Sequence, residues 1–352
     1  MKKLLALLLC AVLCLSLAAC ASNTATTTTG TASTETTAET TAEETASSEE
    51  ASETAEPAAD AKQYVVGICQ LVQHEALDAA TNGFMDALNE ALPGQVTFDL
   101  KNASNDIPTC GTIVTGFVAS NVDLILANAT PALQAAATAT QTIPILGTAV
   151  TEYGVALDIK DFNGTVGGNI SGTSDLAPLD QQADMLLELL PEAQNVGILY
   201  CSAEANSVYQ ADVVKAALEA KGVNVTVYTF ADSNDVATVT QTACAENDAL
   251  YIPTDNTAAS CTEAINNVAE PAGVPIVAGE EGICKGCGIA TLSIDYYELG
   301  KTTGAMAAKI LTGEANVSEM PIEYYQNPVK KYDAARCEAL GITVPADYVA
   351  IG

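Results

Sequence analysis

The chain is short of positive charge. Of its 352 residues, 13 are lysine or arginine and 44 are aspartate or glutamate, which gives a formal net charge of −31. Because nucleic-acid phosphates are bound by clustered lysine and arginine, this composition argues against a nucleic-acid partner. The only arginine is Arg336. A carboxylate ligand would therefore be held by backbone N–H groups and hydroxyls, not by a guanidinium fork.

Histidine and tryptophan are equally scarce. There is no tryptophan, and His74 is the only histidine, so every histidine-dependent catalytic scheme depends on this one residue. Cys69 is its nearest nucleophile in sequence, but Cys69 belongs to an apolar run, where a buried cysteine is usually inert. There is no G-x-S-x-G elbow and no phosphate loop. We expect no enzymatic activity; the alternative is a surface thiol or hydrolytic enzyme that uses Cys69 and His74.

Metal-binding patterns are also lacking. Cys284 and Cys287 have C-x-x-C spacing, but a structural zinc site needs two more ligands. The chain has no second C-x-x-C and no paired histidines. We therefore expect no metal and no cofactor, and we expect an ordinary loop around these two cysteines, with a local disulfide as a further option.

The longest apolar run lies at the N-terminus. It extends from Leu4 to Leu17, behind the basic pair Lys2-Lys3, and it is too short for a membrane-spanning helix. The run leads into Leu17-Ala-Ala-Cys20, which ends a predicted signal peptide of residues 1–19. This segment resembles the bacterial lipobox. The resemblance implies that Cys20 is lipidated and becomes the mature N-terminus.

The segment that follows is polar and of low complexity. Residues 21–60 consist largely of Thr, Ala, Ser and Glu, with no aromatic and no basic residue. Such a composition does not bury enough apolar surface to offset its ordering entropy, and its acidic residues repel one another. We therefore predict that residues 20–61 form a disordered tether behind the lipidated cysteine.

The body of the chain alternates apolar strand-like runs with helical periods. This alternation predicts parallel β-α-β units with right-handed crossovers. The same order of features occurs twice, which predicts two similar α/β lobes with parallel sheets. Predicted strands at 64–69, 122–127 and 143–147 correspond to those at 195–200, 249–253 and 274–278. Predicted helices lie at 76–92, 133–140, 208–221 and 236–245, and the second half has a further strand at 223–230.

The remaining C-terminal residues are too few for a third domain, and we expect them to complete both sheets. They contain predicted strands at 292–295 and 321–325 and predicted helices at 297–311 and 333–340. The first lobe then comprises residues 62–175 plus about 292–320, and the second comprises 176–291 plus about 321–352. Chain crossings near 173–180, 291–296 and 319–325 would form a three-crossover hinge, and a hinge between two lobes makes a cleft.

Polar loops follow the predicted strands, where ligands of parallel sheets bind. Several of these loops begin a helix, whose free N–H groups suit a carboxylate. Acidic residues in the same loops suit an ammonium group, so the set fits a zwitterion such as an amino acid, although a sugar or a purine also suits acidic loops. For single residues the alternative is a helix cap, which we expect of Thr130, Ser207 and Thr254.

The predicted ligand-binding residues all lie in these loops or at the crossings. From the first lobe and the first crossing they are Gln70, Leu71, His74, Ala129, Thr130, Thr148, Ala149, Val150, Ser174 and Asp175. From the second lobe and the second crossing they are Glu204, Ala205, Asn206, Thr254, Asp255, Asn256, Glu280 and Asp295.

Several loops are similar to those of a known family. Gln70-Leu-Val-x-His74, Glu204-Ala-Asn-Ser207, Pro253-Thr-Asp-Asn-Thr257 and Asp295-Tyr-Tyr resemble ABC-transporter substrate-binding lipoproteins, in the branch that includes tryptophan- and other aromatic-amino-acid-binding proteins. The likeness extends from Tyr64 to Ile342. It implies the type I periplasmic-binding-protein fold, two Rossmann-like lobes joined by three crossovers.

The resemblance also implies a role. Such a protein is a monomer, lipid-anchored on the extracytoplasmic face of the bacterial cell membrane, that captures a small ligand and delivers it to an ABC permease. An aromatic amino acid is favoured; a purine, a nucleoside or a sugar is the alternative, as is a ligand-sensing domain that serves a membrane receptor. The sequence departs from the family at Gly279-Glu-Glu281, where Gly-Asp-Glu is expected. By carry-over the first lobe contributes Leu71, His74, Thr130, Ala149 and Val150, and the second contributes Asn206, Thr254, Asp255, Asn256 and Glu280.

Overall fold

A computed structural model describes residues 62–352. The predicted signal peptide (1–19), the lipidation of Cys20 and the predicted tether (20–61) lie outside the described residues. Within residues 62–352, no helix is long and apolar enough to span a membrane.

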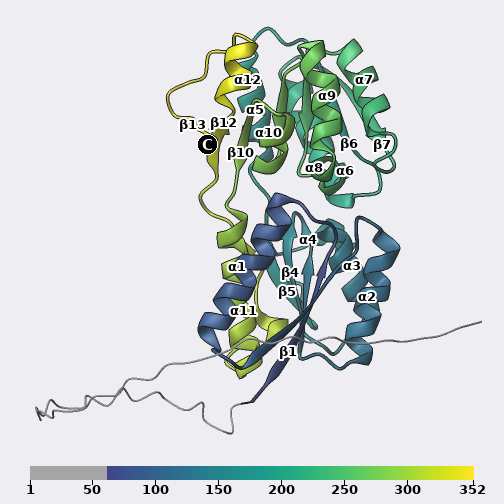
Figure 1. The fold of residues 1–352 in the computed structure, drawn as a ribbon, viewed down its shortest axis with the longest axis vertical. Coiled ribbons are helices and arrows are strands. Elements are labelled where there is room, and N and C mark those ends of the chain that lie inside the picture. The colour runs from purple at the N-terminus through teal and green to yellow at the C-terminus, as the bar shows by residue number, and fades with distance from the viewer. Residues whose placement is uncertain (1–61) are drawn as a thin grey trace, which may run out of the picture. The chain divides into compact units, whose positions relative to one another are not determined.

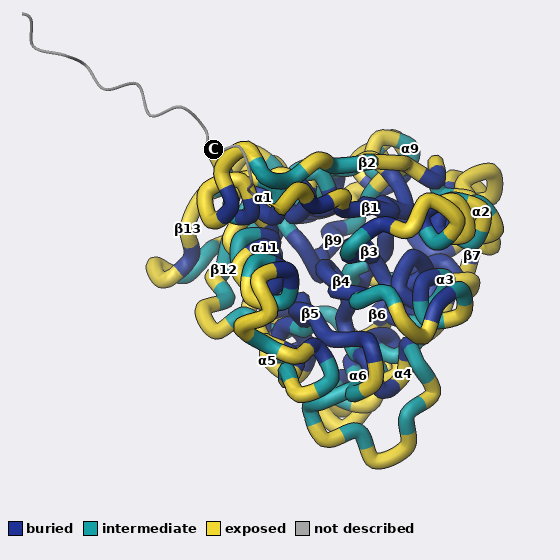
Figure 2. Tube along the Cα trace, turned by 90° about the horizontal axis from the view of Figure 1, so that it is seen from below, coloured by how far each residue is buried: buried dark blue, intermediate teal, exposed yellow. Residues whose placement is uncertain are grey.

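The first sheet has six strands in the order β11-β5-β4-β3-β1-β2, and all neighbours are parallel. Its central strands are buried on both faces, as Figure 2 shows, whereas the edge strand β2 is largely exposed. The strands are β1 (Tyr64–Gln70), β2 (Val96–Asn102), β3 (Leu124–Asn128), β4 (Ile145–Val150), β5 (Ile170–Ser174) and β11 (Glu323–Tyr324). The helices are α1 (Glu75–Ala91), α2 (Ile107–Ala119), α3 (Thr130–Ala139), α4 (Tyr153–Ala156) and α11 (Tyr296–Thr312), with a 3-10 turn η1 (Val317–Glu319).

The second sheet has seven strands in the order β13-β12-β10-β9-β8-β6-β7, and only the pair β10 and β12 is antiparallel among its described ladders. The strands are β6 (Asn195–Cys201), β7 (Asn224–Phe230), β8 (Ala249–Ile252), β9 (Ile276–Ala278), β10 (Ala290–Ser293), β12 (Val329–Tyr332) and β13 (Val349–Ala350). The helices are α5 (Leu179–Leu189), α6 (Ala205–Ala220), α7 (Val236–Glu246), α8 (Asn256–Ser260), α9 (Thr262–Ala272), α10 (Glu281–Cys287) and α12 (Ala334–Ala339).

The two sheets repeat one topology. The order β5-β4-β3-β1-β2 in the first corresponds to β10-β9-β8-β6-β7 in the second, so the predicted pair of similar α/β lobes is confirmed. Helices cover both faces of each sheet (Figure 1), and each face has its own hydrophobic cluster. Strands buried on both faces are typical of parallel sheets, and this is why they appear in the sequence as continuous apolar runs.

The chain passes between the lobes three times, at residues 175–178, 294–295 and 325–328. The third crossing differs from our expectation. The segment predicted as a strand at 321–325 was placed in the second lobe, but β11 pairs with β5 of the first sheet, so the chain crosses after Tyr324. The second lobe likewise keeps residues 290–293, because β10 pairs with β9 and β12.

Helix α11 returns to the first lobe and packs against α1 at very short range. A Cβ atom placed on Gly300 would lie 2.0 Å from the carbonyl oxygen of Ala80, and one on Gly83 would lie 2.1 Å from that of Tyr297. Only glycine permits two helix backbones to approach so closely. This contact fixes the start of α11, and therefore Tyr296, beside the crossings.

The cysteine pair predicted to lie in an ordinary loop lies on a helix instead. Cys284 and Cys287 are both buried on α10, one helical turn apart, and both are free thiols. Their apolar neighbours in the second lobe explain the helix, since the pair contributes to the hydrophobic cluster around Ile283. Among residues 62–352, no group of three or more His, Cys, Asp or Glu side chains is placed to hold a metal ion.

Candidate ligand-binding site between the lobes

The carboxyl ends of the two sheets meet between the lobes. His74 follows β1 and its Nε2 lies 3.2 Å from Oδ1 of Asn256, which follows β8 of the second lobe. Asn105 follows β2 and donates from Nδ2 to the Thr257 hydroxyl at 3.0 Å. An ion pair between Glu75 and Lys285 joins the lobes nearby. The loops in which we predicted ligand contacts therefore include those that face one another.

On the first lobe, several polar atoms at these strand ends are buried without a partner. They are His74 Nδ1, Asn128 Oδ1, Thr130 Oγ1 and, at the first crossing, Asp175 Oδ1. Buried polar atoms in proteins are nearly always paired, so each unpaired one requires an explanation. Four of them lie at one edge of the first sheet, at the loops and the crossing where we predicted ligand contacts.

Backbone strain marks the same edge. Ala129 has φ 89° and ψ 156°, and Ala149 has φ 51°, although neither residue is glycine. Ala129 directly precedes α3, and Ala149 lies where β4 shifts register against β5. Such conformations cost of order 1–3 kcal/mol each and are concentrated at ligand sites. The first turn of α3 is uncapped, because Ala129 has no side-chain acceptor.

Asp175 is the most exceptional of the unpaired groups. Its carboxylate is buried, Oδ2 accepts a hydrogen bond from the Tyr296 hydroxyl at 3.0 Å, and Oδ1 has no partner. Burial raises the pKa of Asp175. No ion pair within residues 62–352 involves this carboxylate. A buried carboxylate without a cation is costly, and a cationic ligand group beside Oδ1 would remove that cost.

On the second lobe, one buried carboxylate organises the facing loops. Glu204 Oε2 accepts from the backbone N–H of Asn256 at 3.0 Å and from its side-chain amide at 2.6 Å. Its Oε1 accepts from the backbone N–H and the hydroxyl of Thr257, at 2.9 and 2.8 Å. Asn206 is tied to the same group, with Nδ2 3.3 Å from Oε2, while Asn206 Oδ1 is buried and unpaired. Glu204 therefore positions Asn256 and Thr257, the residues that contact His74 and Asn105 of the first lobe.

Asp255 and Glu280 serve as helix caps in the second lobe. Asp255 accepts from the backbone N–H of Ala258 and of Cys201, both at 2.7 Å, and Glu280 accepts from that of Gly282 at 2.7 Å and from that of Ile283. Burial, with a smaller contribution from the Glu204 charge, raises the pKa of Asp255. Burial raises the pKa of Glu280 to about 7. Both carboxylates accept from backbone N–H groups of their own lobe, and their role toward an ammonium group stays a prediction.

The other predicted site residues divide into two groups. Three of them hydrogen-bond within the first lobe: Gln70 to Thr81 and Asp78, Thr148 to Thr303, and Ser174 to the Thr151 carbonyl. Asp295 is exposed and caps α11 by accepting from the N–H of Glu298. The second group lies at the facing edges: Leu71, Ala129, Ala149 and Val150 are buried there, Ala205 begins α6, and Thr254 bonds to Gln210 and Gly279 beside Asn206.

The helix-cap alternative is wrong for the residues to which we applied it. Thr130 is the first residue of α3, whose N-cap is Ala129. Ser207 lies inside the first turn of α6, and Thr254 precedes the actual cap of α8, Asp255. None of the three hydroxyls caps its helix, which leaves Thr130 Oγ1 available for another partner.

Three residues outside the predicted set of ligand-binding residues belong to this region, and Thr257 and Tyr296 lie in loops that carry the family resemblance. Tyr296 donates to Asp175, Asn105 bonds to the second lobe, and Thr257 joins Asn105 to Glu204. Tyr296 is part of the Asp295-Tyr-Tyr segment, which was the available signal. Asn105 gives no local signal, because its partner is 152 positions away in the chain.

The geometry does not support the thiol-enzyme alternative. His74 contacts Asn256 and not Cys69. The Cys69 thiol is fully buried, and the neighbouring Cys110 thiol together with burial raises its pKa. A thiol with a raised pKa is a poor nucleophile, because the thiolate is the reactive form.

Two cavities lie along the boundary between the lobes. One of about 380 Å³ is lined by Gln73 and His74 of the first lobe and by Ser260 and Lys285 of the second. Another, of about 160 Å³, is lined by Ala76 and by Glu280 of the second lobe, with Tyr296 at the crossing. Both adjoin the N-terminus of α1, next to the loops described above.

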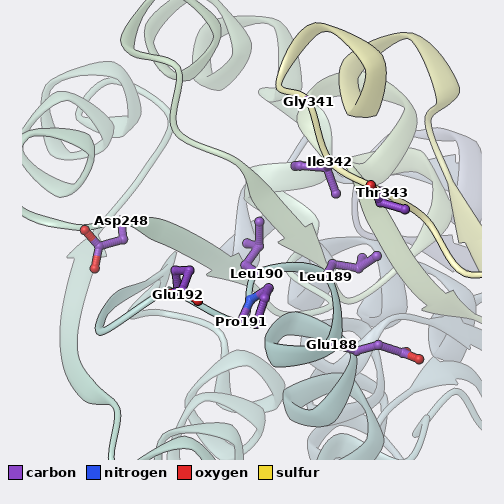
Figure 3. A pocket seen from close by; sticks show the side chains of 10 residues that line it. Glu188, Leu189, Leu190, Pro191, Glu192, Asp248, Gly341, Ile342 and Thr343 are labelled. Carbon is purple, nitrogen blue, oxygen red and sulfur yellow. The ribbon is translucent and has the colours of Figure 1, made fainter.

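A larger cavity, of about 600 Å³, lies elsewhere (Figure 3). It belongs to the second lobe alone and is lined by Glu188, Leu190, Glu192 and Asp248, with Ile342 opposite. Asp248 accepts hydrogen bonds from the backbone at Gln194 and Asn195, where β6 begins. This is the amino edge of the sheet, whereas ligands of parallel sheets bind at the carboxyl edge. The cavity is therefore not the candidate site.

Comparison with known proteins agrees with this geometry. The family model described as ABC transporter substrate binding protein matches residues 65–349. A tyrosine-binding protein of Clostridioides difficile (strain R20291) is 36% identical over 264 residues, which is 74% of this chain and 76% of that protein. The fold also matches an ABC domain from Streptococcus pneumonia in complex with L-Trp, with a TM-score of 0.77 and 30% identity over 81% of this chain and 97% of that one.

A second structure helps to define the lobe arrangement. The ligand-free, open structure of a Clostridium difficile substrate binding protein with adhesive properties is 35% identical and covers 82% of this chain and all of that one, yet its TM-score is 0.62. The more similar sequence gives the poorer superposition, as expected when two lobes differ in their hinge angle. With its hydrogen bonds between the lobes, the present structure lies nearer to the tryptophan-bound protein. The match over residues 65–349 shows that the chain belongs to the family of ABC transporter substrate binding proteins.

Proposed function

We propose that this substrate-binding protein captures an aromatic amino acid between its lobes and delivers it to the permease of an ABC importer. The observation that carries the proposal is the pair of unpaired groups at the first lobe's edge. Asp175 is a buried carboxylate that lacks a cation, and Thr130 presents an unpaired hydroxyl at the uncapped start of α3. A zwitterion would satisfy both, its ammonium group at Asp175 and its carboxylate at α3.

The aromatic side chain is supported by the surrounding surface and by relatives. Leu71, Ala149 and Val150 are buried apolar residues at the same strand ends, and they offer a ring an apolar surface. A relative at 36% identity is named for tyrosine, and a structural neighbour was solved with L-Trp. Asn206 and His74 would supply further polar contacts.

Closure follows from differential binding. A ligand shifts the open and closed forms only by the difference between its affinities for them. In the closed form Asn256 and Thr257 reach His74 and Asn105, so a ligand that completes the first lobe's unpaired groups also favours these contacts. The closed form would then dock on the permease.

We further propose that the protein acts outside the cytoplasmic membrane as a lipid-anchored monomer. The support is the Leu17-Ala-Ala-Cys20 segment with its basic and apolar flank, and the Thr/Ala/Ser/Glu-rich residues behind it. One copy suffices because each chain contributes both lobes of the site. Mass spectrometry of the mature N-terminus tests the anchor: a Cys20 that carries lipid at the N-terminus supports it, whereas an unmodified N-terminus would contradict lipidation at this residue.

The ligand proposal is tested on purified protein, stripped of bound ligand, with a thermal-shift panel of amino acids, purines and sugars. A ligand at 100 times its dissociation constant adds about 2.7 kcal/mol of stability. The chain has no tryptophan, so bound L-tryptophan can also be followed by its own fluorescence without background. A shift confined to aromatic amino acids supports the proposal. A shift only with purines or sugars would replace the ligand, and no shift at all would contradict small-molecule capture.

A further inference from the structure

Two of the hydrogen bonds between the lobes lead back to one carboxylate, and the Glu75–Lys285 pair is separate from it. His74 contacts Asn256, Asn105 contacts Thr257, and the side chains of Asn256 and Thr257 both donate to Glu204. Glu204 is 1% exposed and accepts five hydrogen bonds from three residues. With every contact a donor, this group acts only as an acceptor.

This arrangement fixes the orientation of the Asn256 amide. Its Nδ2 lies 2.6 Å from Glu204 Oε2, and a flipped amide would place oxygen against a carboxylate oxygen. Asn256 Oδ1 therefore faces His74. An amide oxygen only accepts, so the hydrogen-bond network assigns a proton to His74 Nε2.

The other ring nitrogen of His74 then has a defined character. In a neutral imidazole with Nε2 protonated, Nδ1 is an acceptor. Burial lowers the pKa of His74, while Asn256 and the carboxylates of Glu204, Asp78 and Glu75 act in the opposite direction. The ring is therefore neutral at pH 7, and its Nδ1 is buried with no partner.

We infer that Glu204, acting through Asn256, holds His74 as the neutral Nε2–H tautomer, so that Nδ1 accepts a hydrogen bond from an N–H or O–H group of the bound ligand. The inference rests on the proposed function. Glu204 is a positioning residue, because it acts on the ligand only through Asn256 and His74.

The neighbouring unpaired atoms have the same polarity. Asp175 Oδ1 and Asn206 Oδ1 are both acceptors, as is His74 Nδ1, so the site requires a ligand rich in donors. An aromatic amino acid has two kinds of hydrogen-bond donor: the ammonium group and, in tyrosine or tryptophan, a ring O–H or N–H. Because Asp175 is the acidic group among these acceptors and suits the ammonium group, the ring donor is the one left for an acceptor such as His74.

The first test is the protonation state of the ring, and the chain is unusually suited to it because His74 is its only histidine. Long-range ¹H–¹⁵N spectra of histidine-labelled mature protein report both ring nitrogens without assignment. At pH 7 the protein with L-tyrosine bound should show a proton on Nε2 alone, because the lobes are then closed, and Glu204→Gln should give a mixture of tautomers. A proton on Nδ1 in the wild-type protein would overturn the inference.

Thr257→Val is the matched control for Glu204→Gln. It removes the hydrogen bond between Asn105 and Thr257 and one donor to Glu204 but leaves Asn256 in place. It should keep the Nε2–H signature. If both variants change the tautomer equally, the effect is one of lobe closure and the positioning role of Glu204 is wrong.

The second test removes ligand donors one at a time. L-Phenylalanine lacks the phenol of L-tyrosine, and 3-(4-hydroxyphenyl)propionate lacks its ammonium group and has no donor in its place. Affinities are compared in the wild type and in His74→Gln, whose amide nitrogen can keep the contact with Asn256 while the Nδ1 acceptor is lost. In a double-mutant cycle, loss of the phenol should cost roughly tenfold in the wild type and little in the variant.

The outcomes are distinguishable. Coupling between His74 and the phenol supports the ligand's ring hydroxyl as the donor to Nδ1. Coupling between His74 and the ammonium group supports the inference with the ammonium group as the donor. If both ratios are the same in wild type and variant, His74 Nδ1 accepts nothing from the ligand and the inference is wrong. If none of the three compounds binds the wild type, the proposed function fails and the ligand half of the inference fails with it.

Discussion

Two helices at the facing edge of each lobe start in different ways, although other helices there do not follow the contrast: Asp106 and Glu152 cap α2 and α4 of the first lobe, and α6 of the second has no side-chain cap. In the first lobe, α1 and α3 start at His74 and Ala129, and neither has a side-chain cap. In the second lobe, α8 and α10 start at Asp255 and Glu280, whose carboxylates accept from their first turns. A filled helix N-terminus has no free N–H groups for an anion, whereas a bare one does.

The polar side chains divide in the same way. The unpaired buried atoms lie mostly on the first lobe and its crossing, while Glu204 and Asp255 satisfy the second lobe's loops internally. Asn206 Oδ1 is the exception on the second lobe's facing loops. The difference indicates that the first lobe recognises the ligand's charged ends, and that the second is a preformed surface that closes over it.

The strongest way to break this comparison is to remove the first lobe's unpaired charge. Asp175→Asn keeps the side chain's size and an acceptor for Tyr296 but removes the negative charge. Hydrogen bonds to charged groups are worth about 1.5–3 kcal/mol, so affinity for an amino acid should fall about 100-fold. Isothermal titration with L-tyrosine measures this directly.

Tyr296→Phe is the matched control for Asp175→Asn, because it leaves the carboxylate charged and removes only the donor to Oδ2. Its effect should be several times smaller. Equal affinities of Asp175→Asn and the wild type would show that the ammonium group binds elsewhere, and the division between the lobes would then be wrong.

Much of the fold could be predicted because its strands are apolar on both faces. The repeat was visible in β1 and β6, in β3 and β8, and in β4 and β9. β5 was not visible in the sequence, because four of its five residues are Ser, Gly or Thr. All five residues of Ile170–Ser174 are nevertheless buried. Its hydroxyls are satisfied by partners such as Thr303, 130 positions from Thr173, which no local pattern shows.

The site could be predicted as a set of loops but not as a set of roles. Strand ends indicate which loops face the cleft, and His74, Thr130, Asp175 and Asn256 are predicted in this way. Whether a carboxylate faces a ligand or a backbone N–H depends on its position relative to the first turn of the following helix. Asp255 and Glu280 look like ligand groups in the sequence, but they cap α8 and α10.

The second lobe's carboxylate caps predict an unusual pH dependence. Burial raises the pKa of Glu280 to about 7, above the 4.5 of the free side chain, so the folded state binds more protons than the unfolded state between these values. Stability therefore falls as pH rises from about 4.5 to 7, with a contribution of about 2 kcal/mol from this group. Burial acts on Asp255 in the same direction.

Chemical denaturation at pH 5 and pH 7.5 tests this, with Glu280→Gln as the variant. At pH 5 the variant should be less stable than the wild type, because its amide nitrogen cannot accept from one of the two backbone N–H groups. The neutral amide does not titrate, so the variant should lose less stability on going to pH 7.5. An exposed acid such as Asp232, changed to Asn, should leave the wild-type slope unchanged. A wild type that gains stability over this range would contradict a buried, protonated cap.

The smallest effect concerns the strained start of α3. Ala129 has φ 89° and ψ 156°, a region populated almost only by glycine, so Ala129→Gly should relieve strain and raise the free energy of unfolding by about 1 kcal/mol. Ala132→Gly lies inside the same helix and should lower it by about the same amount, because glycine is a poor helix former. The two changes delete the same methyl group, and their opposite signs in urea denaturation would separate strain from packing. Because Ala129 fixes the position of the uncapped end of α3, Ala129→Gly should also weaken ligand binding slightly while it stabilises the fold. A variant with both higher stability and higher affinity would show that the strained start of α3 has no role in recognition.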